Sequence, residues 1–269
     1  MPRPPAAFPL LAVLFCAALL CACAPASAPV RPPSAVAATP AGRDRLALAA
    51  FHLRDERGRG PLEALKVLDA PQAGEAEGEA GELALRALAL RQLGRHAEAV
   101  DALDRLLLTR GGLPPAALAE AFVERGLALA ALGHQDRAAE DFAAALGLAP
   151  GHVPALMARA DQLFALGQPA EAEAGYSRVI ALDPSSALAH INRGVARDEQ
   201  GRFGEAIADF TRALALDPGS PAAHVNRGVS RSQAGDMAGM CADYAAACRL
   251  GACHRLASAR EMGYCRDGR

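Results

Sequence analysis

The sequence predicts an all-α fold, a solenoid in which antiparallel helix pairs stack one upon the next. A pattern of two amphipathic stretches recurs at a period of 34 residues in four abutting blocks, 119–152, 153–186, 187–220 and 221–254. The 269 residues are 52% hydrophobic but only 4% aromatic, and they include no Trp, which suits the packing of helix on helix. No block can bury a core alone, so stability must come from contacts between neighbouring blocks.

Residues 1–22 have the pattern of a bacterial export signal. Arg3 supplies a positive start, and Leu10–Ala22 is an apolar run of 13 residues, too short to span a bilayer. The run ends in Leu-Cys-Ala-Cys, which resembles the lipobox of bacterial lipoproteins, whose cysteine is lipidated and becomes the new N-terminus. The resemblance implies a lipoprotein signal peptide over 1–22 and lipidation of Cys23. An ordinary secretory signal cleaved nearby is the alternative.

Ala24 follows the lipobox cysteine, and in lipoproteins an alanine there is compatible with sorting to the outer membrane. We therefore expect a lipid-anchored protein of the bacterial cell envelope, on the periplasmic face, with the outer membrane favoured over the inner. Residues 23–42 form a Pro/Ala-rich linker whose only charge is Arg31. Such a composition cannot bury enough apolar surface to fold, and its prolines favour an extended spacer.

Residues 43–79 are predicted to form a degenerate helix pair and a loop. Leu46 and Phe51 belong to the first helix, and Pro61 starts the second. The Gly/Glu-rich segment from Gln72 to Gly81 is expected to be a loop. Because the repeat positions do not align here, the pair is interpreted as an N-terminal cap.

Five repeats follow over residues 80–252, the first at 80–113 and separated from the next by a short insert, Pro114–Leu118. Within 187–220 we expect helices at about Ala187–Gln200 and Phe203–Leu216, because Pro218 cannot continue the second helix. The recurring positions are a first-helix small residue (Gly126, Ala160, Gly194, Gly228), a turn glycine (Gly94, Gly133, Gly167, Gly201, Gly235), a second-helix alanine (Ala99, Ala138, Ala172, Ala206), a ring (Phe142, Tyr176, Phe210, Tyr244) and a closing proline (Pro150, Pro184, Pro218).

These positions resemble the tetratricopeptide repeat family over about two-thirds of the chain. The sequence departs from the family where the first-helix aromatic is replaced and where Gly239 stands in place of the second-helix alanine. The replacing residues are Leu83, Phe122, Leu156, His190 and His224. The resemblance implies a right-handed superhelical solenoid of antiparallel helix pairs. The small residues should let the two helices of a pair approach closely while the ring fills the space between them.

An arginine recurs at the seventh position of each repeat, as Arg86, Arg125, Arg159, Arg193 and Arg227. In three repeats an aspartate stands sixteen residues later, at Asp141, Asp209 and Asp243, which predicts a salt bridge between the two helices of the repeat. The repeat of Arg159 has Gly175 at the acidic position, so Arg159 is either free or bound elsewhere. A catalytic or anion-binding role for these arginines is the less favoured alternative.

The resemblance implies that first-helix residues line an inner, partner-binding groove. The expected lining residues are Glu120, Val123, Leu127, Met157, Asp161, Ile191, Asn192, Val195, Val225, Asn226 and Val229. In peptide-binding members an asparagine at the position of Asn192 and Asn226 often hydrogen-bonds the ligand backbone, since an amide both donates and accepts. The alternative is that these asparagines only pack locally. The mixed lining suggests a partly apolar peptide or helix as ligand.

Four cysteines lie close together near the C-terminus, Cys241, Cys248, Cys253 and Cys265. In an exported chain an even number of cysteines indicates disulfides. Cys241 and Cys248 lie about 10.5 Å apart on one helix, too far to bond each other. A final helix at about Cys253–Met262, folded back along the previous one, favours Cys248–Cys253 and Cys241–Cys265, while the crossed pairing stays open. Residues 253–269 are thus expected to form a disulfide-stapled capping helix.

Function is predicted from what the repeats imply and from what the sequence lacks. The spacing of the cysteines has no CxxC pair, so a metal site is disfavoured, and no catalytic motif or cofactor fingerprint occurs. A net charge of −2 disfavours nucleic acid. We expect no enzyme and no cofactor, but a lipid-anchored periplasmic scaffold or adaptor that binds other envelope proteins or peptides. The alternative is a protein that binds or modifies peptidoglycan. Imperfectly capped solenoid ends also favour a homo-oligomer.

Overall fold

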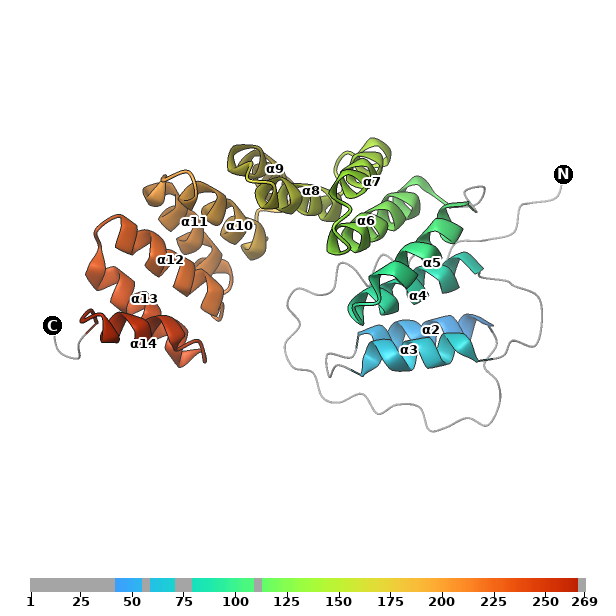
Figure 1. The fold of residues 1–269 in the computed structure, drawn as a ribbon, viewed down its shortest axis with the longest axis horizontal. Helices are drawn as coiled ribbons and strands as arrows, with labels where there is room; N and C mark the ends of the chain where they lie inside the picture. The colour runs from blue at the N-terminus through green and yellow to red at the C-terminus, as the bar shows by residue number, and fades with distance from the viewer. Residues whose placement is uncertain (1–41, 55–58, 71–78, 109–112, 266–269) are drawn as a thin grey trace. The chain divides into compact units, whose positions relative to one another are not determined.

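The computed structural model describes residues 42–54, 59–70, 79–108 and 113–265, and every regular element in these ranges is an α-helix (Figure 1). The chain divides into two compact units, an N-terminal unit, Met1–Ala149, and a C-terminal unit, Pro150–Arg269. Each unit is a series of helix pairs, so the all-α solenoid predicted from the 34-residue period is confirmed. No helix in the described ranges is long and apolar enough to cross a membrane.

The N-terminal unit contains three helix pairs. The first pair is α2 (Gly42–Leu53) and α3 (Gly60–Asp69), and it packs on the first repeat. That repeat consists of α4 (Glu79–Gln92) and α5 (His96–Leu108), and the next of α6 (Pro115–Ala131) and α7 (Gln135–Leu148). Two boundaries differ from expectation. Residues 79–81 belong to α4 and not to a loop, and residues 115–118 form the first turn of α6 and not an insert between repeats.

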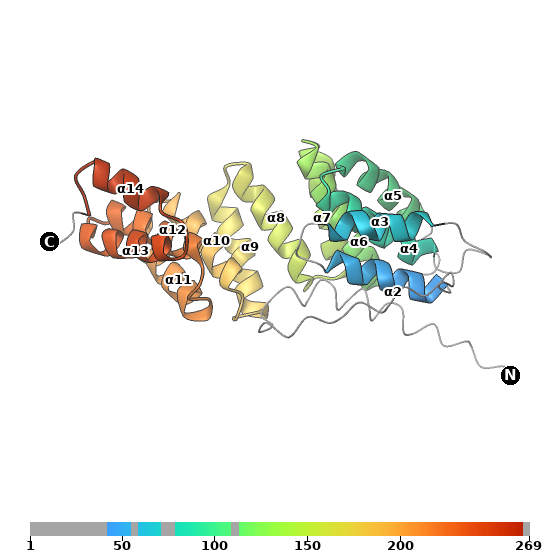
Figure 2. The same cartoon turned by 90° about the horizontal axis from the view of Figure 1, so that it is seen from below.

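The C-terminal unit contains three further pairs and a last helix (Figure 2). The pairs are α8 (Val153–Ala165) with α9 (Pro169–Leu182), α10 (Ala187–Asp198) with α11 (Phe203–Leu216), and α12 (Pro221–Gln233) with α13 (Met237–Arg249), followed by α14 (His254–Glu261). Each of α10 and α12 packs against its own second helix and against the second helix of the preceding repeat. The helices of 187–220 fall where the sequence predicts them.

The link between consecutive repeats is encoded by short polar residues. After α11, the Asp217 carboxylate accepts a hydrogen bond from Gly219 N at 3.0 Å, which closes a turn that Pro218 prevents from continuing as helix. Ser220 then caps α12, because its Oγ accepts from Ala223 N at 3.3 Å. Asp183 and Ser186 do the same before α10. The Asp-Pro-x-Ser sequence therefore ends one helix and starts the next.

The core of each repeat depends on the pairing of a small residue with a ring. A Cβ added at Gly194 would lie 2.7 Å from the Phe210 ring, and one added at Gly126 would lie 2.6 Å from Phe142. Both rings are only 1% exposed. The glycines therefore let the helices of a pair approach until the ring fills the gap, as the sequence predicts. Between α10 and α11 the chain reverses at Gly201, whose φ of 72° is unfavourable for residues with a Cβ.

Candidate functional site

The first helices of the C-terminal unit present a mixed apolar and polar surface, which we call the first-helix wall. Its residues are Met157 and Asp161 on α8, Ile191, Asn192 and Val195 on α10, and Val225, Asn226 and Val229 on α12. On each helix they follow the three- and four-residue spacing that places side chains on one face. Asp161 is exposed and the other seven are partly exposed, so all eight predicted residues are accessible.

The apolar members of the wall are anchored in the core beneath it. Met157 packs against the cluster of Ala160, Ala172, Tyr176 and Ala196. Ile191 packs against Ala213, Leu214 and Ala223, and Val229 against the cluster that contains Met240 and Tyr244. These contacts hold the side chains in place while leaving part of each accessible to a partner.

Asp161 connects two repeats through hydrogen bonds. Its Oδ1 accepts from the Tyr176 hydroxyl at 2.7 Å and from Asn192 Nδ2 at 3.0 Å. Burial of the carboxylate raises the pKa of Asp161, and the two hydrogen bonds counter this effect only in part. Burial and the neighbouring Asp161 likewise raise the pKa of the Tyr176 hydroxyl, which therefore stays a donor at neutral pH.

Asn192 and Asn226 are equivalent in sequence but not in environment. The amide nitrogen of Asn192 is engaged by Asp161. Val195 occupies the repeat position of Asp161 next to Asn226, and the Asn226 side chain has no hydrogen-bond partner in the described part of the chain. Asn226 thus offers a donor and an acceptor, whereas Asn192 offers mainly its amide oxygen.

One residue expected in the groove is buried in the N-terminal unit. Val123 on α6 is 2% exposed, so it belongs to the core and the prediction that it lines a binding surface is wrong. Its neighbours Glu120 and Leu127 are partly exposed. The wide apolar stripe of α6 lets Val123 pack inward where Met157, Ile191 and Val225 remain accessible.

The recurring arginines form the salt bridges that the spacing predicts. Arg125 binds Asp141 through two hydrogen bonds of 2.9 and 2.6 Å, and Arg193 binds Asp209 through bonds of 3.0 and 2.6 Å. Arg227 binds Asp243 in the same way, with a shortest distance of 2.7 Å. These arginines therefore join the two helices of their own repeat.

Sequence reasoning missed that the same arginines also reach the preceding repeat. Arg193 Nη1 donates to Ser177 Oγ on α9 at 3.2 Å, and Arg227 Nη1 donates to Thr211 Oγ1 on α11 at 3.2 Å. In the N-terminal unit, Arg125 Nη1 donates to Asp104 on α5 at 2.6 Å. The three acceptors share one repeat position, and that recurrence of polar residues was the available signal. Each guanidinium thus joins three helices.

Arg159 lacks both kinds of partner. Gly175 stands where its aspartate would be, and a Cβ there would lie 2.7 Å from the Cβ of Ala160. Ala160 itself replaces the glycine of the other repeats, so the extra methyl leaves no room for a side chain at 175. The polar position of the preceding repeat holds Ala143. Arg159 is exposed and makes no ion pair with the described residues.

The two histidines at the aromatic position face the aspartates of these salt bridges. His190 is 6% exposed, and its Nδ1 lies 3.6 Å from Asp209 Oδ1. The His224 Nδ1 lies 3.3 Å from Asp243 Oδ1. Both histidines therefore contact the second helix of their own repeat rather than forming a pair with each other. Within the described ranges, no three His, Cys, Asp or Glu side chains are grouped as metal ligands would be.

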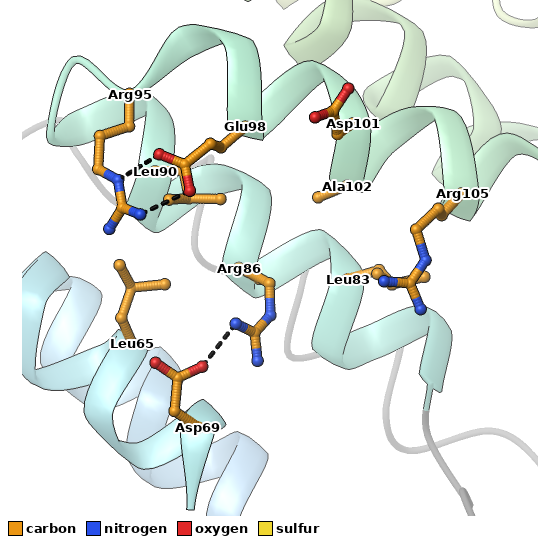
Figure 3. Close-up of a pocket in the computed structure, with 10 residues that line it drawn as sticks. All are labelled: Leu65, Asp69, Leu83, Arg86, Leu90, Arg95, Glu98, Asp101, Ala102 and Arg105. Atoms are coloured by element: carbon orange, nitrogen blue, oxygen red, sulfur yellow. Dashed lines mark hydrogen bonds and ion pairs between the residues drawn. The ribbon is translucent and has the colours of Figure 1, made fainter.

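A cavity of about 230 Å³ lies in the N-terminal unit between α3, α4 and α5, and sequence reasoning did not find it (Figure 3). Arg86 on α4 points to Asp69 on α3 with a contact of 2.6 Å, and Arg95 holds Glu98 at 2.6 Å. The positive charges of these two arginines are therefore balanced by carboxylates at the cavity itself.

Two disulfides attach the last helix to α13. Cys241 pairs with Cys265 at a Cα distance of 5.1 Å, and Cys248 pairs with Cys253 at 4.0 Å. This is the pairing favoured by an antiparallel arrangement, not the crossed one. Leu256 and Ala259 of α14 pack on Met240 and Tyr244, so α14 covers apolar side chains that a following repeat would otherwise cover. Cys23, the expected lipidation site, lies outside the described residues.

Comparison with protein families matches the chain to the model described as Tetratricopeptide repeat, over residues 84–153, 157–221 and 197–252. These ranges span more than half of the chain. A search of curated protein sequences finds no significant match.

Solved structures share the fold. A MamA structure, residues 41 to the end, from Desulfovibrio magneticus RS-1 is 23% identical, with 66% of this chain and 97% of that chain covered and a TM-score of 0.57. YrrB, a TPR protein with an unusual peptide-binding site, is 20% identical, with 70% of this chain and 92% of that chain covered and a TM-score of 0.55. At these identities the likeness concerns the fold alone.

Proposed function

This chain belongs to the tetratricopeptide repeat family, whose members are generally non-catalytic scaffolds for proteins and peptides, and from that premise we propose that it is a lipid-anchored periplasmic scaffold. Its first-helix wall binds extended segments of other envelope proteins. The lipobox-like sequence that ends at Cys23 supports the lipid anchor and the location. The repeats carry the binding, and the linker of residues 23–42 separates them from the membrane surface.

The observation that carries the binding role is the set of accessible amides among anchored apolar side chains. The Asn226 amide is accessible and has no partner in the described part of the chain, and a peptide backbone offers the complementary donor and acceptor. Val195, Val225 and Val229 lie beside it at helical spacing and provide apolar contact. An extended segment could therefore bind through its backbone and bury alternate apolar side chains. The peptide-binding site of YrrB is in accord with this use of the fold.

The test is affinity capture from an envelope extract with the full-length chain as bait. A parallel bait carries Asn192→Ala and Asn226→Ala, and a control bait carries Glu140→Ala, which changes an exposed residue of α7 outside the wall. We expect the wild-type and control baits to retain the same discrete set of proteins and the double variant to lose it. Melting curves must show that all three baits are folded.

Two results would contradict the proposal. If the double variant retains the same proteins as the wild type, the wall is not the binding surface. If no bait retains protein while the wild-type chain binds purified peptidoglycan, the protein is a glycan binder instead of a scaffold.

A further inference from the structure

Asp161 is the one wall residue whose presence the repeat pattern does not explain. The equivalent positions hold Leu127, Val195 and Val229. Its carboxylate accepts the Tyr176 and Asn192 hydrogen bonds through Oδ1, while Oδ2 accepts none from the described residues. The wall therefore presents a carboxylate oxygen that is held in position and available.

The Tyr176 hydroxyl alone does not account for this aspartate. Tyr244 occupies the same ring position in the last repeat, and there the residue equivalent to Asp161 is Val229. A tyrosine in this core is thus accommodated without a carboxylate. An asparagine at position 161 would also accept both hydrogen bonds, so the fold needs an oxygen here but not its charge. Since burial raises the pKa of Asp161, keeping it ionised costs stability at neutral pH.

No described cation neutralises Asp161. Four of the five arginines on α8, α10 and α12 are bound to carboxylates of second helices: Arg193 and Arg197 to Asp209, and Arg227 and Arg231 to Asp243. The fifth, Arg159, lies two residues before Asp161, which on a helix directs the two side chains to different faces. The negative charge of Asp161 therefore remains available on the wall.

Apolar side chains flank this charge. Met157 precedes Asp161 by four residues and Phe164 follows it by three, so both lie on the same face of α8, and both are partly exposed. The Asn192 bond places α10, with Val195 one turn beyond Asn192, beside the carboxylate. A carboxylate bordered by a thioether, a ring and aliphatic groups suits a long cationic side chain, whose stem is apolar and whose end is charged.

We infer that Asp161 is a specificity-determining residue that selects a lysine or arginine in the segment bound by the first-helix wall. The occupant is an extended peptide segment of a partner protein with a basic residue next to apolar ones. The cationic group binds Oδ2, and the apolar neighbours pack on Met157 and Val195. This inference rests on the proposed function, because it requires that the wall binds peptides.

The test uses random dodecapeptides displayed on phage, selected against the full-length wild-type chain and against Asp161→Asn. The substitution removes the charge and keeps an oxygen that accepts from Tyr176 and Asn192. We expect peptides retained by the wild type to be enriched in a Lys or Arg beside apolar residues, and those retained by the variant to keep the apolar pattern without the basic residue. Glu140→Gln, which removes a charge outside the wall, should select as the wild type does.

A selected peptide and its copy with Gln in place of the basic residue then give a double-mutant cycle. With the wild-type chain the Gln peptide should bind roughly threefold to tenfold more weakly, as expected for a charged hydrogen bond at a partly exposed site. With Asp161→Asn the two peptides should bind equally. Added salt should weaken the basic peptide on the wild type and leave the variant unaffected.

The outcomes separate this inference from the proposed function. Peptides that bind the wild type and are lost on Asn192→Ala with Asn226→Ala, but show no basic preference or the same preference on Asp161→Asn, overturn the role of Asp161 and leave the wall as a binding surface. If the wild-type chain retains no peptide, or the retained peptides still bind the double asparagine variant, the proposed function fails and the inference fails with it.

Discussion

At the scale of single residues, the chain carries buried carboxylates whose environments push their pKa values in opposite directions. Asp161 has no cationic partner, and burial raises its pKa. Burial also opposes ionisation of Asp243, but hydrogen bonds from Arg227 and His224, together with the charges of Arg227 and Arg231, outweigh it and lower the pKa of Asp243. The ionised form of Asp243 is thus stabilised by folding, whereas that of Asp161 is not.

The lowered pKa of Asp243 predicts a loss of stability in acid. A group whose pKa is lower in the folded state than its ordinary value of 3.8 contributes stability above that value, and the contribution disappears as the pH falls through the lowered pKa. We expect Asp243→Asn to destabilise the protein at neutral pH and to flatten the fall in stability below about pH 4. Urea unfolding measured across this range checks it, with exposed Asp101→Asn as control. An unchanged pH profile in Asp243→Asn would refute the assignment.

At the scale of elements, the repeats are joined by arginines that contact three helices each. Arg193 on α10 binds Asp209 on α11 and Ser177 on α9. The side chains of Arg193 and Asp209 are 17% and 5% exposed, so water competes little for the pair. A ring at the core of each pair and an arginine at its edge therefore join the same helices through different forces.

Arg193 and Arg159 form a matched pair of positions for testing this role. Arg193→Leu removes the bonds to Asp209 and Ser177, although Arg197 still binds Asp209 at 2.8 Å, so we expect a loss of about 1–3 kcal/mol in the free energy of unfolding. Arg159→Leu occupies the same repeat position, where no described partner is present, and should change stability by less than about 0.5 kcal/mol. Equal losses in urea unfolding at neutral pH would show that the salt bridge is not the cause.

At the scale of the whole chain, order along the sequence separates anchoring, spacing, binding and capping. The expected signal peptide and lipidated cysteine come first, then the Pro/Ala-rich linker, the degenerate pair α2–α3, the repeats, and finally α14 with its two disulfides. The disulfides replace what the last repeat has lost. Gly239 stands at the alanine position because Asp236 caps α13 there, accepting from Gly239 N at 2.8 Å, and an added Cβ would overlap the Asp236 carboxylate.

The proposed anchor predicts a difference between two neighbouring cysteines. In bacteria fed labelled palmitate, Cys23→Ser should abolish incorporation of label and move the protein from the membrane pellet to the soluble fraction, because Cys23 is the expected acceptor. Cys21→Ser, two residues earlier, should incorporate label as the wild type does, since residue 21 would leave with the signal peptide. Equal labelling of the Cys23→Ser variant would contradict lipidation at this residue.

The sequence by itself determined the family, the helix pairs, the role of the small residues and rings, and the first partner of each recurring arginine. These features repeat every 34 residues and join positions within a single repeat, so periodicity alone shows them. The predicted wall residues followed in the same way, but Val123 did not, because burial depends on what packs against a helix and not only on its own pattern.

Only the tertiary structure decided which residues of different repeats meet. Asp161 and Asn192 are 31 residues apart, Arg227 and Thr211 are 16 apart in neighbouring repeats, and the cavity of the N-terminal unit joins a degenerate pair to the first repeat. Such contacts depend on how one helix pair rotates on the next, which the 34-residue period does not specify. The charge that distinguishes one part of the wall from the rest is therefore visible only once the repeats are stacked.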